Sequence, residues 1–319
     1  MDFDLSGGQR SWTEKARALG RDLPGEVTPL DLIARTVRVG LIDARADLET
    51  AALAVEALAE ESAASAMVFA MYTAVVLADA TGDRLVRGET VGAISLSSEE
   101  VPVEEGGRLS GRASWVGPAT ERGVAIVGAR NRGELVASLV ALDGPGVRCE
   151  AVDTAALRGF PCAHVSFTST PCTVLGSPLP TMARVRVLLA SVGIGMGRRA
   201  LREALHAAHV HRGRGAGGEQ TVQGLLADAA TELDAAMLLT WKAAQARPLS
   251  LATASMAKLG ATEATQRAVA RATQVVGSDT FRSGHIIERL AQDVRALELL
   301  AGRTESLREA VASEILPRS

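Results

Sequence analysis

Three histidines lie close together in the segment HAAHVH. His206 and His209 share one face if the segment is helical, and His211 follows shortly after. Paired imidazoles at this spacing can ligate a metal ion, but a stable site needs a further ligand. No third Cys, Asp or Glu ligand is evident at a useful spacing. We therefore favour a solvated helix end and expect no metal.

Two glycine-rich segments flank these histidines. GIGMG at 193–197 lies inside a helical pattern and follows no predicted strand, so we do not expect a dinucleotide-binding fingerprint there. We expect these glycines to allow close contact between helices instead. RGRGAGG at 212–218 is a basic loop between two helical segments. It is either an ordinary connector or a loop that places Arg212 or Arg214 on a phosphate group, and the sequence leaves both alternatives open.

The composition excludes several classes of function. The chain has 319 residues, of which 47% are hydrophobic and 22% charged, as is typical of a globular protein of about two domains. A net charge of −3 and only 3% aromatic residues argue against nucleic-acid binding and a polybasic membrane surface. No apolar run approaches the roughly 18 residues of a membrane span. Cys149, Cys162 and Cys172 form no CxxC pair, and the N-terminus is acidic, so we expect a cytoplasmic protein without disulfides.

The periodicity changes twice along the chain. Residues 1–90 carry small and apolar residues at helical spacing, for example Leu48, Ala52 and Val55. Residues 91–178 consist of short Val-rich runs separated by Gly and Pro, which is typical of antiparallel strands in a barrel or sandwich. Residues 179–319 contain four amphipathic segments with short connections. We therefore predict an α+β protein: an N-terminal helical domain (1–90), a middle β domain (91–178) and a C-terminal four-helix bundle (179–319).

Several motifs follow one another in an order that is typical of one family. They are GETVGAISLSSEE, GRLSGRASWVG, LRGFPCAHVSF, SMAKLGATEATQRAVARATQVVG and ERLAQDVRALELLAGRT. In this order and spacing they resemble the acyl-CoA dehydrogenase family over nearly the whole chain. The resemblance implies that family's fold of helical domain, β-barrel and helical bundle. It also implies an oxidoreductase in which a Glu removes the α-proton of an acyl-CoA and FAD accepts the β-hydride.

The proton-abstracting Glu of the family is missing from both positions where it occurs. Ala301 occupies the position in the turn after the last long helix, and Val185 occupies the alternative position, just before Arg186. Neither side chain can accept a proton, so we expect no catalytic residue in this chain's own site. Glu305 and Glu298 are candidates for a displaced base, and the alternative for both is a solvated helix charge.

The flavin-binding motifs of the family are eroded. Trp115 matches the family's flavin-facing Trp, and its alternative is a packed barrel tryptophan. The family's GSD turn is missing between SLSSEE and EEGG, and its R-x-x-F-G element survives only as Arg212 and Arg214.

Two further elements remain in part. Gln274 and Gly277 match a Q-x-x-G-G element whose second Gly is Ser278 here, and Gln220 is either an adenine contact or helix surface. In the family these elements reach the flavin of the neighbouring subunit. The resemblance therefore implies an FAD shared at a subunit interface, with Arg212, Gln274, Gly277, Trp115 and Gln220 as cofactor contacts.

A short N-terminal region and a missing base together resemble one subunit type. Actinobacterial heterotetrameric (α2β2) acyl-CoA dehydrogenases of steroid catabolism pair a full-length catalytic subunit with a shortened subunit that lacks the Glu. The resemblance implies a chain that is inactive alone, with a catalytic subunit as partner and a bulky acyl-CoA as substrate. Two rivals remain: a self-sufficient dehydrogenase using Glu305, and a flavin-free, redox-neutral acyl-thioester enzyme or binding protein.

Overall fold

The chain folds as helices, then strands, then helices. The computed structural model describes residues 5–24, 27–42, 47–78, 83–95, 100–120, 122–211 and 219–316. The first helices are α1 (Gly7–Asp22), α2 (Pro29–Arg38), α3 (Leu48–Ala59), α4 (Ala63–Val76) and α5 (Asp83–Val86). The strands are β1 (Val91–Ser95), β2 (Val103–Glu105), β3 (Arg108–Gly117), β4 (Gly123–Asn131), β5 (Glu134–Ala141), β6 (Val147–Val152) and β7 (Cys162–Gly176). The last helices are α6 (Leu179–His211), α7 (Glu219–Gln245), α8 (Leu251–Val276), the 3₁₀ turn η1 (Gly277–Phe281), α9 (Ile286–Leu299) and α10 (Thr304–Ile315).

Side-chain caps begin the N-terminal helices. Ser6, Thr28, Asp47 and Ser62 each accept a hydrogen bond from a backbone N–H in the first turn of α1, α2, α3 and α4. Helix α4 carries no charged residue and is buried continuously from Ser65 to Val75, which makes it a core helix rather than a surface one. It packs on β1 on one side and on α6 on the other.

The strands form one sheet that closes into a barrel. The pairings run from β1 to β3, β7, β5, β4 and back to β1, with β2 and β6 added at the edges. Small and branched residues fill its interior: Ala93, Leu109, Ala113, Val116, Ala125, Val127, Ala129, Val140, Leu142, Ala163, Val165 and Phe167. The predicted barrel is confirmed, with one difference. β4 runs parallel to β1 and β2, because β3 is antiparallel to both and the chain turns back after β3.

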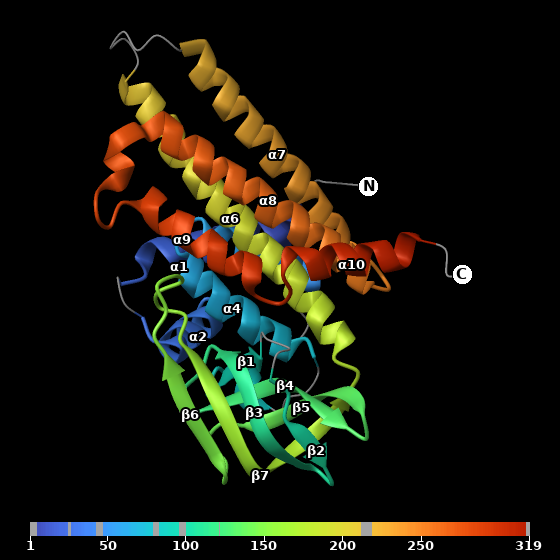
Figure 1. Cartoon of the computed structure of the whole chain (residues 1–319). Coiled ribbons are helices and arrows are strands. Elements are labelled where there is room, and N and C mark those ends of the chain that lie inside the picture. Colours follow the sequence, from blue (N-terminus) through green and yellow to red (C-terminus); the bar gives the residue numbers. More distant parts are fainter. Residues whose placement is uncertain are drawn as a thin grey trace.

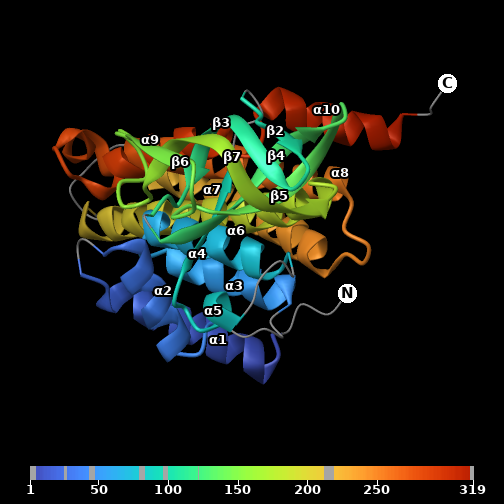
Figure 2. The ribbon, with the colours of Figure 1, turned by 90° about the horizontal axis from the view of Figure 1, so that it is seen from below.

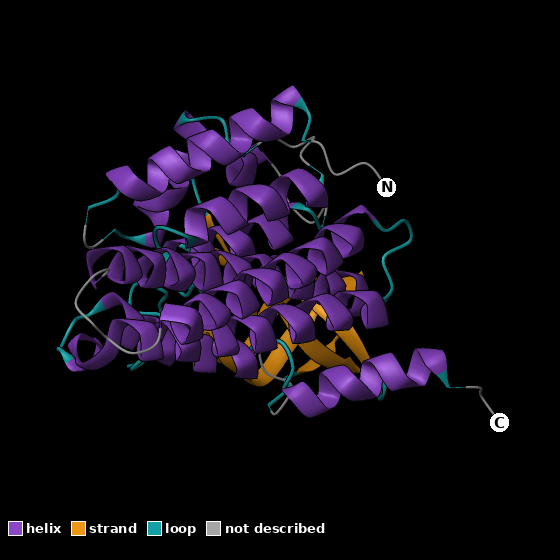
Figure 3. Cartoon of the chain, turned by 90° about the horizontal axis from the view of Figure 1, so that it is seen from above, coloured by secondary structure: helices purple, strands orange, loops and turns teal. Residues whose placement is uncertain are grey.

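The bundle packs around α6. Figure 1 shows α6 crossing the centre of the molecule between α7 and α8 on one side and the N-terminal helices on the other. Viewed from below, the barrel and α10 lie on one side of α6 and α1–α5 on the other (Figure 2). The four predicted bundle helices are present, and α10, which the sequence did not predict, projects from the body near the C-terminus (Figure 3).

Glycines let α6 approach its neighbours closely. A Cβ on Gly195 would lie 2.4 Å from the Glu56 carbonyl oxygen, and one on Gly197 would lie 2.4 Å from a Leu233 methyl. The expectation that these glycines serve helix packing is confirmed. Residues Leu179–Val210 of α6 are also long and apolar enough to cross a membrane, and 78% of their most apolar window is buried inside the molecule.

Candidate functional site

A pocket lies between the barrel wall and the first turns of α6. Its volume is about 80 Å³. It is lined by Ile94, Ser95, Val101, Ile126, Gly128, Leu135, Ala137, Pro178, Thr181, Met182 and Val185. The side-chain hydroxyls in this set belong to Ser95 and Thr181, and none of these lining residues has a titratable side chain. The pocket can therefore hold an apolar or amide-bearing chain but supplies no proton acceptor.

The two positions expected for a base belong to different elements, α6 and the turn that follows α9. Val185 lines the pocket directly, and Ala301 is buried in the turn after α9 with a left-handed backbone (φ 56°). Between them stands Arg186, whose Nε donates to the Ala301 carbonyl at 3.1 Å and whose terminal nitrogen donates to Ser255 Oγ at 2.6 Å. Of the two expected positions, Val185 lines the pocket and Ala301 is linked to the next residue of α6 through Arg186, and neither side chain carries a proton-accepting atom.

A second buried cation holds the same turn. Lys258 of α8 is fully buried, and its Nζ donates to the carbonyls of Gly302 at 2.9 Å and Glu298 at 3.3 Å. Burial, and then the charge of Arg186, lowers the pKa of Lys258 to about 7, while Glu298 opposes that change. Burial also lowers the pKa of Arg186. Neither cation forms an ion pair within the described part of the chain, so Lys258 is held by backbone carbonyls and Arg186 by a carbonyl and the Ser255 hydroxyl.

The two candidate displaced bases are not at the pocket. Glu305 is exposed in the first turn of α10. The Glu298 carboxylate accepts hydrogen bonds from Gln266 at 2.7 Å and Thr304 at 3.1 Å. Neither residue lines the pocket, so reaching an α-carbon there would require the turn to rearrange.

Trp115 lies in the barrel wall one strand from the pocket. It is half-buried with a left-handed backbone (φ 55°) at a bulge in β3, and its neighbour Val116 pairs with the pocket residue Ser95. Its ring meets His164 edge-to-face, with centroids 5.7 Å apart. The His164 Nδ1 atom is buried and has no hydrogen-bond partner among the described residues. This part of the wall therefore combines an aromatic ring with an unused polar atom.

The other residues expected to contact a flavin lie elsewhere. Gln220 is exposed at the start of α7, and Gln274 is exposed near the end of α8. Gly277 ends α8 with φ 78° and open space around it. Figure 1 shows these two helix ends at the end of the bundle remote from the barrel. Arg212 and Arg214 lie outside the described residues. One chain therefore does not bring Trp115 together with Gln220, Gln274 and Gly277.

Comparison with known proteins places this architecture. Residues 177–316 match the family model described as "Acyl-CoA dehydrogenase, C-terminal domain". Butyryl-CoA dehydrogenase from Megasphaera elsdenii superposes with a TM-score of 0.86 over 99% of this chain and 100% of its own, at 18% identity. The chain has the acyl-CoA dehydrogenase fold.

Sequence relatives agree with this assignment. Human mitochondrial short-chain specific acyl-CoA dehydrogenase is 30% identical over 230 residues, which are 65% of this chain and 56% of the relative. The 3-sulfinopropanoyl-CoA desulfinase of Paraburkholderia xenovorans is 28% identical over 195 residues, which are 56% of this chain and 50% of that protein. The chain thus spans about half the length of these curated relatives. Together the matches support the acyl-CoA dehydrogenase family, whose proteins bind FAD.

The described residues fit a flavin in two separate halves. Trp115 and His164 offer an aromatic surface for a planar ring system, but the pocket lining contains no charged group for a diphosphate. On the ring side the space is limited, because a Cβ on Gly117 would lie 2.7 Å from the Phe160 ring. The residues expected to reach the rest of FAD lie at the far end of the bundle. The fit within one acyl-CoA dehydrogenase-fold chain is therefore incomplete.

The positions of His206 and His209 also bear on the site. Both are exposed near the end of α6. Within the described ranges no three His, Cys, Asp or Glu side chains gather closely enough to hold a metal ion. These histidines have the solvated positions that the sequence favoured.

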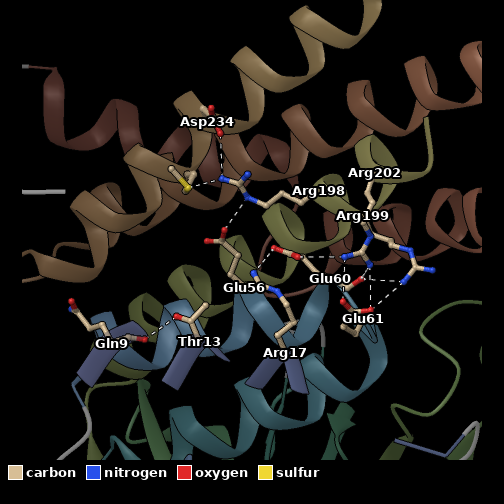
Figure 4. Close-up of polar contacts among 11 residues, drawn as sticks. Gln9, Thr13, Arg17, Glu56, Glu60, Glu61, Arg198, Arg199, Arg202 and Asp234 are labelled. Atoms are coloured by element: carbon tan, nitrogen blue, oxygen red, sulfur yellow. Dashed lines mark hydrogen bonds and ion pairs between the residues drawn. The ribbon is translucent and has the colours of Figure 1, made fainter. Parts of the chain in front are cut away.

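Sequence reasoning missed a polar junction of α1, α3, α6 and α7, drawn in Figure 4. Arg198 Nε donates to Glu56 Oε1 at 3.0 Å, and its terminal nitrogen meets Asp234 at 3.2 Å. Around this pair, Arg17 contacts Glu60, and Arg199 and Arg202 contact Glu61. Glu56 is only 7% exposed, and burial raises its pKa while Arg198 opposes that rise. Charged residues on four helices would look like solvated faces in sequence, which hides the junction.

Sequence reasoning also missed the role of Lys258. The one available signal is its position, because a lysine stands inside the alanine-rich stretch ATASMAKLGA, whose other residues are small or apolar. A helix of that composition is expected to be buried. A cation at its centre must then find buried acceptors, and the carbonyls of Glu298, at the end of α9, and Gly302, after it, provide them.

Proposed function

We propose that this chain is the non-catalytic subunit of a heteromeric, FAD-dependent acyl-CoA dehydrogenase that introduces an α,β double bond into an acyl-CoA thioester. One observation carries the proposal: both base positions are aliphatic, Ala301 and Val185, and no residue lining the pocket is titratable. A dehydrogenase of this kind must take a proton from the α-carbon. We propose that a partner chain supplies the group that does so.

The chain's own residues then have structural and binding tasks. Bound FAD would supply hydride acceptance from the β-carbon. Trp115 would face the ring system, while Thr181 lines the pocket with a hydroxyl that could meet a thioester arm. Arg186 and Lys258 stabilise the turn around Ala301 through hydrogen bonds to the carbonyls of Ala301 and Gly302. None of these groups is a carboxylate, so the chain positions and encloses a ligand without moving its proton.

The partner is proposed to be a full-length catalytic acyl-CoA dehydrogenase subunit in a cytoplasmic α2β2 heterotetramer. Support comes from the separation of the two halves of the flavin site. Gln220, Gln274 and Gly277 are exposed or open at the far end of the bundle, where a neighbour's cofactor could meet them. Arg212, which lies outside the described residues, is proposed to join them on the shared FAD.

The acyl group is proposed to be a bulky, steroid-derived one that sits mainly against the partner. A pocket of about 80 Å³ is well below the roughly 300–1,000 Å³ of a site that encloses a drug-sized ligand. A polycyclic group therefore cannot lie inside this chain's pocket. We propose that the polycyclic group lies in the partner's pocket instead.

A tagged pull-down from the native host tests the proposal. The expected result is an approximately equimolar, full-length, yellow acyl-CoA dehydrogenase that carries a Glu at one of the two base positions. An Arg212→Ala variant should reduce the flavin content of that complex, and unchanged flavin content would remove Arg212 from the site. Recovery of the chain alone would contradict the proposal.

If the chain is recovered without a partner, its colour and its response to an acyl-CoA separate the two rival functions. A yellow chain that an acyl-CoA bleaches would support a self-sufficient enzyme using Glu305. A colourless chain that binds an acyl-CoA would support a redox-neutral activity. That second candidate gains weight because one relative is named a desulfinase rather than a dehydrogenase.

A further inference from the structure

The barrel face that lines the pocket continues beyond it. Ile126 and Gly128 of β4 both line the pocket, and alternate residues of a strand share a face. Arg130 is the next residue of β4 on that face. It also pairs directly with Leu135 of β5, which is itself a lining residue, so the two side chains stand next to each other. Arg130 therefore lies at the outer end of the pocket.

Exposed apolar side chains lie beside Arg130 at this outer end. Leu135 is 46% exposed, and Val103, the partner of Arg130 in β2, is 52% exposed. Leu179, which begins α6 beside the lining residues Pro178 and Thr181, is 54% exposed. Apolar side chains thus continue from the pocket to the surface, where Arg130 adds a cation.

The guanidinium of Arg130 has little to bind within the chain. Its side-chain contact in the described residues is one long hydrogen bond to the Gly133 carbonyl, at 3.4 Å, and it forms no ion pair there. The carboxylate of Glu104 nearby is taken by the Gly107 N–H and the Asn131 side chain. Asn131 and Glu104 neighbour Arg130 and Val103 in their strands, so they point to the opposite face. An anion approaching along the pocket face would meet Arg130 first.

These features select a ligand with two parts. The inner part of the ligand lies in the apolar pocket, whose lining includes Ser95 and Thr181. The outer part is an anion that binds the Arg130 guanidinium. From Ile126 to Arg130 the strand rises by about 13 Å, at roughly 3.3 Å per residue. An extended chain of that length would reach from the pocket to Arg130. We infer that Arg130 binds the phosphate end of the thioester arm whose inner part enters the pocket. This inference rests on the proposed function, because that function makes the ligand a coenzyme A thioester.

Binding of coenzyme A and of pantetheine, which lacks the phosphates, separates the two parts of this ligand. Both would be titrated by calorimetry into the purified full chain and into Arg130→Gln. The matched control is Arg132→Gln, because Arg132 is exposed in the adjacent turn and carries the same charge. We expect Arg130→Gln to weaken coenzyme A binding about tenfold, as loss of a charge-assisted contact does, and to leave pantetheine binding unchanged. Arg132→Gln should alter neither by more than about twofold.

The other outcomes overturn the inference in distinguishable ways. If coenzyme A binds the native chain and both variants equally, Arg130 is no phosphate contact and the proposed function still stands. If Arg130→Gln weakens pantetheine as much as coenzyme A, the residue acts through packing and not through the phosphate. If the native chain binds neither probe, the inference fails together with the thioester-binding part of the proposed function.

Discussion

The turn around Ala301 and the polar junction at Glu56 bury charges of opposite sign. At the turn, two buried cations, Arg186 and Lys258, face backbone carbonyls without an ion-paired carboxylate. At the junction, a buried carboxylate, Glu56, is paired with Arg198. A buried charge must find a partner of some kind, and carbonyl dipoles satisfy a cation more weakly than a carboxylate does. The comparison teaches that the charges buried in both regions hold shape, and that neither region offers a free base at the pocket.

The largest expected effect is loss of the junction's cation. Arg198→Met should leave the Glu56 carboxylate buried without its partner and lower the free energy of unfolding by about 3 kcal/mol. Urea denaturation measures the change. The control is Arg35→Met, which removes an exposed ion pair with Asp31 and should cost no more than about 0.5 kcal/mol. Equal losses in the two variants would show that the junction behaves as a surface pair.

Gly195→Ala tests how tightly α6 is held against the junction. The new methyl group would lie 2.4 Å from the Glu56 carbonyl oxygen and 2.5 Å from the Ala59 Cβ, so the helices must move apart. We expect a loss of about 2 kcal/mol of unfolding free energy. Gly224→Ala is the matched control, because a Cβ there meets nothing within 4 Å and alanine favours a helix by roughly 1 kcal/mol. A neutral Gly195→Ala would contradict the close packing.

The stability of the turn around Ala301 should depend on pH through Lys258. The pKa of Lys258 is about 7 in the folded chain and 10.5 as a free side chain, so between these values the unfolded chain binds more protons. Stability should therefore rise with pH through this window, by about 1 kcal/mol from pH 7 to pH 8. Lys258→Met should abolish that rise in urea unfolding curves, and Lys242→Met, on exposed surface, should keep it. The same slope in both variants would assign the rise to another group.

The smallest expected effect concerns the base position itself. Ala301 has φ 56°, a conformation that costs a non-glycine residue roughly 1 kcal/mol. Ala301→Gly removes that strain but loses a similar amount through chain entropy, so stability should change by less than about 0.5 kcal/mol. Ala257→Gly, in the interior of α8, has no strain to relieve and should cost about 1 kcal/mol. A large loss in Ala301→Gly would show that the methyl group itself supports the turn.

Sequence reasoning reached the fold because its signals are local. Alternating Val-rich runs predicted the barrel, and helical periodicity predicted the bundle. The assignment of the two base positions to Ala301 and Val185 rests on the family motifs and stays a prediction. Sequence reasoning could not find the pocket's full lining, because Ile94, Leu135 and Met182 come together only when the barrel packs on α6.

The missed features are long-range contacts between polar groups. Arg198 reaches Glu56 across 142 positions of sequence, and Lys258 reaches Gly302 across 44. Hydrophobic periodicity cannot predict such a contact, because it depends only on the residues near each partner in the sequence. The parallel pairing of β1 with β4 is of the same kind, since it follows from closure of the sheet and not from either strand's residues.

Helix α6 carries Val185 at the pocket, Arg186 under the turn, Gly195 against α3 and Arg198 in the junction. Each successive residue of an α-helix is rotated by about 100°. An insertion or deletion of one residue between Arg186 and Gly195 would therefore turn every later contact away from its partner at once. Length change should be forbidden across this stretch of α6 even where substitution is tolerated, and homologous chains should align through it without gaps.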